Sequence, residues 1–252
     1  MSRSSVKEAD IYSNSDDLSE AAAGFMTDLA VRSISERGRF VIALAGGSSP
    51  RRLYQALADP SWRDRINWGR WHFFISDERV VPLSDPNSNF GMAEKTLLSK
   101  VPVRPEQVHL VPTEAGDPDT VARAYEADIR QFFGVGDTEM PRFDAVLLGM
   151  GSDGHTASLF PGKPALEEKE RLVAPSPPGV LPPPVERVTF TYPLINSARA
   201  VIFLLAGADK QAAFRSVRDG VPLEGTPVVP AARVHPESGV LRWFVDSTAI
   251  GS

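Results

Sequence analysis

Short apolar runs alternate along the chain with longer segments in which apolar residues recur every three or four positions. Several of the short runs are apolar on both faces, which is typical of parallel strands covered by helices on each side. The short runs predict strands at Arg39–Ala45, Trp71–Ile75, Val108–Val111, Phe143–Leu148, Arg187–Thr191, Ala200–Leu205 and Leu241–Val245. The longer segments predict helices at Asp16–Glu36, Pro50–Ala58, Thr120–Phe133 and Asp209–Arg218, with Ser49 as the N-cap of the second helix and Pro50 as its first residue.

This alternation predicts an α/β fold with an open, doubly wound, mostly parallel sheet, Rossmann-like, with helices on both faces. Ligands bind such sheets at the carboxyl ends of the strands, so the loops that follow the predicted strands are the places to search for a site. The proline-rich segment 175–184 can form neither a helix nor a central strand, and we expect an extended connection there. A chain of 252 residues is expected to form one domain spanning 1–252.

Composition and charge exclude several classes of protein. The net charge is −5 and no basic run exceeds two residues, so nothing indicates a nucleic-acid or anionic-membrane partner. The absence of cysteine excludes disulfides, thiolate nucleophiles and Cys-ligated zinc. The first residues lack the apolar core of a signal peptide, and no apolar run approaches the ~18 residues of a membrane span. We therefore expect a cytoplasmic protein.

Two loops after predicted strands carry residues suited to an anion. Gly46 and Gly47 let the backbone turn sharply and approach a ligand, and Ser48 leads into a predicted helix whose free N–H groups favour negative charge. Lys210 falls in the first turn of another predicted helix, where the helix dipole disfavours a cation unless an anion is near. Taken singly, an ordinary glycine turn with a serine cap and a flexible surface lysine explain these residues equally well.

Two further loops carry acidic and basic residues. Asp77 and Arg79 follow the apolar run WHFFI, where a solvated charge cluster is the alternative interpretation. Asp153 and His155 lie on a glycine-rich turn after another predicted strand, where an imidazole beside a carboxylate can act as a general base. One Asp and one His fall short of the three or four ligands of a zinc site, so we expect no metal.

The same turn contains the spacing G-x-G-x-x-G, from Gly149 to Gly154. A dinucleotide-binding fingerprint needs a long helix directly after it and an acidic residue ending a second strand ~20 positions onward. Pro161 and Gly162 end any helix within little more than a turn, and no such acid follows. We interpret the match as accidental. Without a mononucleotide motif either, the four loops together indicate a small phosphorylated metabolite as ligand.

Five blocks of sequence, in order along nearly the whole chain, resemble the signatures of the 6-phosphogluconolactonase family, whose fold is similar to that of glucosamine-6-phosphate deaminase. They are LAGGSSPRRLYQAL, FFISDERVVPLSDPNSNFGMAEKTLL, FDAVLLGMGSDGHTASLFPG, ERVTFTYPLINSARAVIFLLAGADKQAAF and VPAARVHPESGVLRWFVD. The resemblance implies hydrolysis of 6-phospho-D-glucono-1,5-lactone to 6-phospho-D-gluconate, the second step of the oxidative pentose phosphate pathway, without a metal or cofactor.

The resemblance also implies roles for individual residues. His155 would be the general base, Asp153 its supporting acid and Arg79 a cation near the substrate. The residues expected to bind the substrate or its phosphate are Gly46, Gly47, Ser48, Asp77, Asn89, Arg187 and Lys210.

Two alternatives remain open at this point. A glucosamine-6-phosphate deaminase or isomerase shares the fold and the Asp-Gly-His turn, but its pattern D-G-H-I-A-F-N-E-P contains a glutamate that the run HTASLFPG lacks. Its M-D-E-Y block is also replaced here by S-D-E-R. A non-catalytic sugar-phosphate sensor is the second alternative, although the chain keeps the Asp-His pair and has no basic helix for DNA.

Overall fold

The computed structural model describes residues 9–180, 183–226 and 228–251. Residues 181–182 of the predicted proline-rich connection lie outside the described residues. Residues 1–8, which begin the N-terminal segment discussed above, also lie outside them. No helix within the described part is long and apolar enough to cross a membrane.

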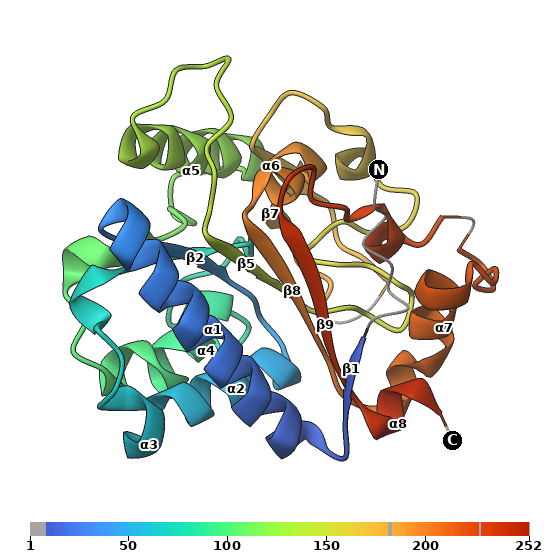
Figure 1. The fold of residues 1–252 in the computed structure, drawn as a ribbon. Coiled ribbons are helices and arrows are strands. Elements are labelled where there is room, and N and C mark those ends of the chain that lie inside the picture. The colour runs from blue at the N-terminus through green and yellow to red at the C-terminus, as the bar shows by residue number, and fades with distance from the viewer. Residues whose placement is uncertain (1–8, 181–182, 227, 252) are drawn as a thin grey trace.

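The described residues form a parallel sheet with the strand order β1-β9-β8-β5-β2-β3 (Figure 1). Its strands are β1 (Asp10–Tyr12), β2 (Phe40–Leu44), β3 (Trp71–Ile75), β5 (Ala145–Leu148), β8 (Ala200–Leu205) and β9 (Val240–Asp246). Every residue of β2, β5 and β8 is buried, as expected for strands that are apolar on both faces. The predicted fold class is therefore confirmed.

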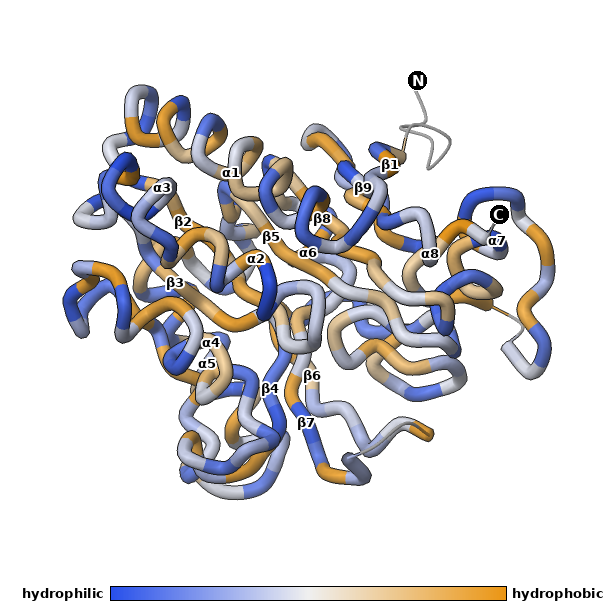
Figure 2. Tube along the Cα trace, turned by 90° about the horizontal axis from the view of Figure 1, so that it is seen from below, coloured by the Kyte–Doolittle hydropathy of each residue, from blue (hydrophilic) through white to orange (hydrophobic). Residues whose placement is uncertain are grey.

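Helices cover both faces of this sheet. α1 packs against β2 and β9 on one face, while α5 and a second, smaller sheet lie on the other (Figure 2). The α-helices are α1 (Ser15–Arg37), α2 (Ser48–Ala58), α3 (Pro60–Arg63), α4 (Asn89–Thr96), α5 (Pro118–Phe133), α6 (Tyr192–Ser197), α7 (Gln211–Asp219) and α8 (Ser247–Ile250). The 3₁₀ turns are η2 (Trp68–Arg70), η3 (Leu98–Lys100), η4 (Pro105–Gln107), η5 (Pro164–Glu167), η6 (Ala208–Lys210) and η7 (Pro230–Arg233).

The second sheet is antiparallel and has the order β4-β7-β6. Its strands are β4 (Asp77–Arg79), β6 (Val173–Ser176) and β7 (Arg187–Phe190). The strand predicted at Arg187–Thr191 is confirmed as β7, but it belongs to this second sheet and pairs with two short strands that the hydrophobic pattern does not reveal. Pro175 lies in β6, an edge strand, where a missing N–H is tolerated.

Most predicted elements differ from the observed ones by one or two residues at their ends, and three differences matter more for the fold and the site. Val108–Val111 forms no strand, and only Val108 makes a single bridge, to Phe73. Val111 is buried in the core, which explains why the segment is apolar without being a strand. The second predicted helix begins at Ser48, with Gly47 as its N-cap, because a φ of 104° at that position favours glycine. Lys210 ends the turn η6 and caps α7 instead of lying in its first turn.

Two buried tyrosines satisfy the backbone where β2 and β3 end. The Tyr54 hydroxyl accepts from the Ala45 N–H at 2.9 Å and donates to the Ala45 carbonyl at 2.8 Å. The Tyr125 hydroxyl does the same for Ile75, at 2.8 and 3.1 Å. Burial raises the pKa of both phenols far above the usual value, so both stay protonated donors. The chain can therefore turn away from the sheet without leaving buried polar groups unpaired.

Replacing Tyr125 by phenylalanine is expected to lower the free energy of unfolding by about 1–3 kcal/mol, because the buried N–H and C=O of Ile75 lose their partner. Denaturant unfolding measures the change. Tyr12→Phe is the matched control, since the Tyr12 hydroxyl makes no hydrogen bond within the described residues. Equal losses in the two variants would contradict the role assigned to the Tyr125 hydroxyl.

Candidate active site

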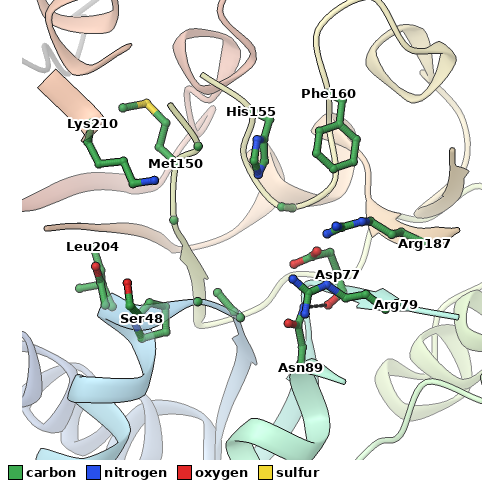
Figure 3. A pocket seen from close by; sticks show the side chains of 18 residues that line it. Ser48, Asp77, Arg79, Asn89, Met150, His155, Phe160, Arg187, Leu204 and Lys210 are labelled. Carbon is green, nitrogen blue, oxygen red and sulfur yellow. Dashed lines mark hydrogen bonds between the residues drawn. The ribbon is translucent and has the colours of Figure 1, made fainter. Parts of the chain in front are cut away.

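A cavity of ≈ 210 Å³ opens where the carboxyl ends of β2, β5 and β8 approach the second sheet (Figure 3). It is lined by residues from all four loops singled out in the sequence. Among them are nine of the ten predicted site residues, namely Gly46, Gly47, Ser48, Asp77, Arg79, Asn89, His155, Arg187 and Lys210. The tenth, Asp153, does not line the cavity but contacts His155 directly. Their individual roles stay predictions.

His155 and Asp153 form a close pair on the turn after β5. The imidazole Nδ1 lies 2.6 Å from Asp153 Oδ1, and the His155 backbone N–H donates to the same oxygen at 3.1 Å. The ring points into the cavity (Figure 3). Gly151 makes this arrangement possible, since a Cβ there would lie 2.2 Å from His155 Nδ1. Asp153 can therefore orient the ring and leave Nε2 directed toward a ligand.

The Asp153 carboxyl is held in its ionised form. Burial by itself would raise its pKa, but the hydrogen bonds and charge of His155 outweigh this and lower the pKa below its usual value. Its second oxygen, Oδ2, is buried and has no hydrogen-bond partner within the described residues. The hydrogen bonds of this carboxylate therefore come from the ring and the backbone N–H of His155.

The opposite side of the cavity favours an anion. Helix α2 begins after Gly47, so no side chain caps its first N–H groups. Its first turn also contains no acidic residue. The partial positive charge of this helix end therefore faces the cavity uncompensated. The Lys210 ammonium points into the same space (Figure 3) and lies 2.9 Å from Oδ2 of Asp209, whose side chain is 63% exposed. An anionic group can compete for this ammonium at small cost, since exposed ion pairs are weak.

Two arginines from neighbouring strands of the second sheet form another side of the cavity. Arg79 in β4 pairs with Arg187 in β7, and both guanidinium groups lie near Asp77 (Figure 3). The pKa of Arg187 is lowered, mainly by burial. The charge of Asp77 opposes this shift, and the charge of Arg79 adds to it. The Nε atoms of both arginines are buried without a hydrogen-bond partner among the described residues. Positive charge and unused donors are therefore concentrated here.

Asp77 and Glu78 tie β4 to the neighbouring loop and to the start of α4. Asp77 Oδ2 accepts from the Ser158 hydroxyl at 2.6 Å, and the Asp77 carbonyl accepts from the Asn89 side-chain amide at 2.6 Å. The fully buried Glu78 carboxylate accepts from the backbone N–H groups of Arg79 and Asn89, at 2.8 and 2.7 Å. Burial raises the pKa of Glu78, and the backbone hydrogen bonds oppose that shift.

Sequence reasoning missed several residues that shape the cavity. Phe160 lies between two functional groups, with its ring centroid 4.7 Å from that of His155 and 5.2 Å from Cζ of Arg187. Met150 and Ala157 also line the cavity, and Ala157 adopts a φ of 47°, which is unusual for a residue with a side chain. Apolar residues carry no chemical signal that distinguishes a site wall from the core, so no pattern could have selected them.

No group of three or more His, Cys, Asp or Glu side chains is placed to hold a metal ion within the part of the chain that the structure describes. The Asp153–His155 pair can carry out acid–base chemistry in the cavity, with cations on two sides of it.

The sequence matches, over residues 13–243, the model of a family described as glucosamine-6-phosphate isomerases/6-phosphogluconolactonase. The chain belongs to this family. Similar relatives within it include the 6-phosphogluconolactonase of Synechocystis, 40% identical over 96% of each chain. A probable 6-phosphogluconolactonase of Arabidopsis thaliana is 38% identical over 96% of this chain and 92% of that one. The resemblance to 6-phosphogluconolactonase that the sequence motifs indicated is thus confirmed.

Solved structures are also similar to this chain. The 6-phosphogluconolactonase of Trypanosoma cruzi aligns with a TM-score of 0.83 and 32% identity, covering 99% of this chain and 97% of that one. A monomeric glucosamine-6-phosphate deaminase aligns with a TM-score of 0.77, covering 96% of this chain and 98% of that one, at 21% identity. At that identity the likeness shows a shared fold and does not discriminate between the two activities.

Substituting Gly151 by alanine is expected to break the Asp153–His155 hydrogen bond, because the new Cβ would lie 2.2 Å from His155 Nδ1 and 2.6 Å from Asp153 Oδ1. Nitrogen-15 NMR of the imidazole should report an altered Nδ1 signal for His155. Gly149→Ala is the control, since a Cβ there meets nothing within 4 Å. An unchanged His155 spectrum in the Gly151 variant would show that the pair does not depend on this glycine.

Proposed function

We propose that this protein is a 6-phosphogluconolactonase, which hydrolyses 6-phospho-D-glucono-1,5-lactone to 6-phospho-D-gluconate in the oxidative pentose phosphate pathway. The observation that carries the proposal is the 2.6 Å contact between Asp153 and His155, whose ring faces a cavity with cationic groups on two sides. Relatives with this name at 40% identity support it. We further propose that residues 1–252 form one catalytic domain, and that it works in the cytoplasm without a metal or cofactor.

In this proposal the phosphate of the substrate binds at the N-terminus of α2. The backbone N–H groups after Gly47 and the ammonium of Lys210 would hold it, with Gly46 keeping the loop close to the ligand. A Cβ at Gly46 would lie 1.9 Å from Asn89 Oδ1, so this glycine also leaves room for the Asn89 side chain. Binding the phosphate remotely from the reacting carbonyl uses binding energy to orient the lactone against its nucleophile.

His155 acts as the general base in this mechanism. With the Nδ1 proton donated to Asp153, Nε2 is free to take a proton from a water molecule as its oxygen attacks the lactone carbonyl carbon. The tetrahedral intermediate then collapses by breaking the bond to the ring oxygen, which takes the proton back from Nε2. Water is consumed and the imidazole returns to its starting state, so no covalent enzyme intermediate is needed.

The negative charge that develops on the carbonyl oxygen needs donors, and Arg79 with its neighbour Arg187 is the group we assign to it. Both carry a buried Nε without a partner in the described residues. Phe160 separates the Arg187 guanidinium from the His155 ring, which keeps the cation close to the base without contact between them. Preorganised donors of this kind stabilise an oxyanion far better than water does.

The decisive test pairs two assays on the purified protein. We expect it to accelerate formation of 6-phosphogluconate from freshly generated lactone above the spontaneous rate, and to release no ammonia from glucosamine 6-phosphate. The run after His155 supports this choice, since Thr156 to Phe160 contains no carboxylate that could serve the extra proton transfers of a deaminase. Ammonia release without lactone hydrolysis would overturn the proposal, and activity in neither assay would favour a non-catalytic sensor.

Replacing His155 by alanine is expected to lower kcat by about 100-fold to 10,000-fold, the range typical of a general acid–base group. Thermal unfolding should be measured on the same sample, because the loss must occur in a folded protein. His235→Ala is the matched control, as this histidine is exposed and lies outside the cavity. A folded His155 variant with near-normal kcat would refute the role assigned to the imidazole.

A further inference from the structure

A second cavity, of ≈ 630 Å³, lies at the opposite edge of the main sheet. It is formed where the strands begin, beside the loop between α5 and β5 that rises at the top of Figure 1. Its volume falls in the range of about 300–1,000 Å³ that is typical of small-molecule sites. Six arginines line it, namely Arg37, Arg39, Arg70, Arg104, Arg142 and Arg199. This concentration of positive charge is notable in a chain whose net charge is −5.

Two of the arginines contact the buried carboxylate of Asp144, and a third, Arg142, lies close enough to Arg199 to repel it. Arg37 Nε donates to Asp144 Oδ1 at 3.0 Å, and Arg199 Nε lies 3.5 Å from the same oxygen. Asp144 Oδ2 is already occupied by the backbone N–H of Val41, at 2.8 Å. Burial lowers the pKa of Arg199, and repulsion from Arg37 and Arg142 lowers it further. Arg37 also pairs with the exposed carboxylate of Glu36, so two carboxylates face three guanidinium groups and do not balance their charge.

The other three arginines lie toward His72, at the start of β3. Burial, together with the charges of His109, Arg39 and Arg104, lowers the pKa of His72 to about 4, so its ring is neutral near pH 7. The only carboxylate within 4 Å of this group in the described residues is that of Glu106, 3.9 Å from Arg104 and 77% exposed at its side chain. Arg70 makes no ion pair within the described residues and is exposed.

Several buried side-chain nitrogens in the cavity make no hydrogen bond within the part of the chain that the structure describes, and Arg199 Nε has only its 3.5 Å ion pair with Asp144. Arg142 Nε, Arg199 Nε and His72 Nδ1 are buried nitrogens without a hydrogen bond in the described residues. Buried polar groups in native proteins are nearly always paired, so unpaired ones at a cavity wall indicate an external partner. Because guanidinium groups bind phosphate oxygens bidentately, phosphate is the anion that suits a cluster of arginines best.

We propose that this cavity is a binding site for a small metabolite that carries two phosphate groups, one held by the arginines around Asp144 and the other by those near His72. Phe133, Val135 and Met140 provide an apolar wall for the organic part of the ligand. The site is separate from the candidate active site, because β2, β5 and β8 run from one to the other. The proposal does not depend on the lactonase activity.

Calorimetric titration of the full-length protein with pyrophosphate, ADP and fructose 1,6-bisphosphate tests the proposal. We expect saturable binding of at least one probe with a dissociation constant below about 1 mM. Pyrophosphate binding as tight as the others would assign recognition to the phosphates alone. Tighter binding of ADP or of the sugar bisphosphate would identify the organic part that the apolar wall accepts.

Variants separate this site from other sources of anion binding. Arg70→Ala combined with Arg104→Ala removes two exposed cations outside the Asp144 network and should weaken binding by about tenfold or more. Arg32→Ala combined with Arg215→Ala is the matched control, since it makes the same charge change at exposed positions elsewhere and should leave binding unchanged. Lys210→Ala, at the other edge of the sheet, should also leave it unchanged.

Three outcomes would overturn the proposal. They are the absence of saturable binding by every probe, an equal loss in the two double variants, and loss of binding in the Lys210 variant. The second would show nonspecific attraction to positive charge, and the third would show that the probes occupy the candidate active site only. Self-association of the protein that depends on Arg70 and Arg104, without binding of any probe, would instead assign the cavity to a contact between copies of the chain.

Discussion

The buried carboxylate of Glu78 is the interaction on which the geometry of the candidate active site depends. Its two oxygens accept hydrogen bonds from four groups, the backbone N–H of Arg79, Asn89 and Phe90 and the hydroxyl of Ser88. These donors belong to β4 and to the start of α4, so one side chain fixes a strand of the small sheet against a helix. Removing such a charge from water is costly unless its donors are already in position, which makes this corner of the fold rigid.

The regular parts of the fold follow from sequence because their pattern is set by burial. β3 and β8 begin and end at the residues that their apolar runs predict, since both faces of each strand are covered. Burial alone does not specify pairing, however. Val111 is as deeply buried as a strand residue but makes no ladder, and β4 is a strand whose three residues, Asp77 to Arg79, are all charged. The pairing of β4 with β7 makes it a strand, and no local pattern encodes that pairing.

The candidate site was accessible to sequence reasoning for a different reason. Parallel strands end at one edge of a sheet, so polar residues placed directly after separate strands are brought together whatever the loops between them do. The rule predicted that Gly47, His155 and Lys210, from three parts of the chain, lie at one site, and all three line the same cavity. It could not find Phe160, whose position follows from a loop, nor the cavity at the opposite edge, whose arginines precede the strands.

Ala157 shows how the molecule balances stability against function. A non-glycine residue with a φ of 47° is strained, and such conformations typically cost on the order of 1–3 kcal/mol. The neighbouring side chains hold it there, since the Thr156 hydroxyl donates to the Gly149 carbonyl and the Ser158 hydroxyl donates to Asp77. A glycine would relieve the strain but would also release the turn that carries His155. Alanine at this position therefore restricts the backbone of the turn that carries His155 more than glycine would, at a cost in folding free energy.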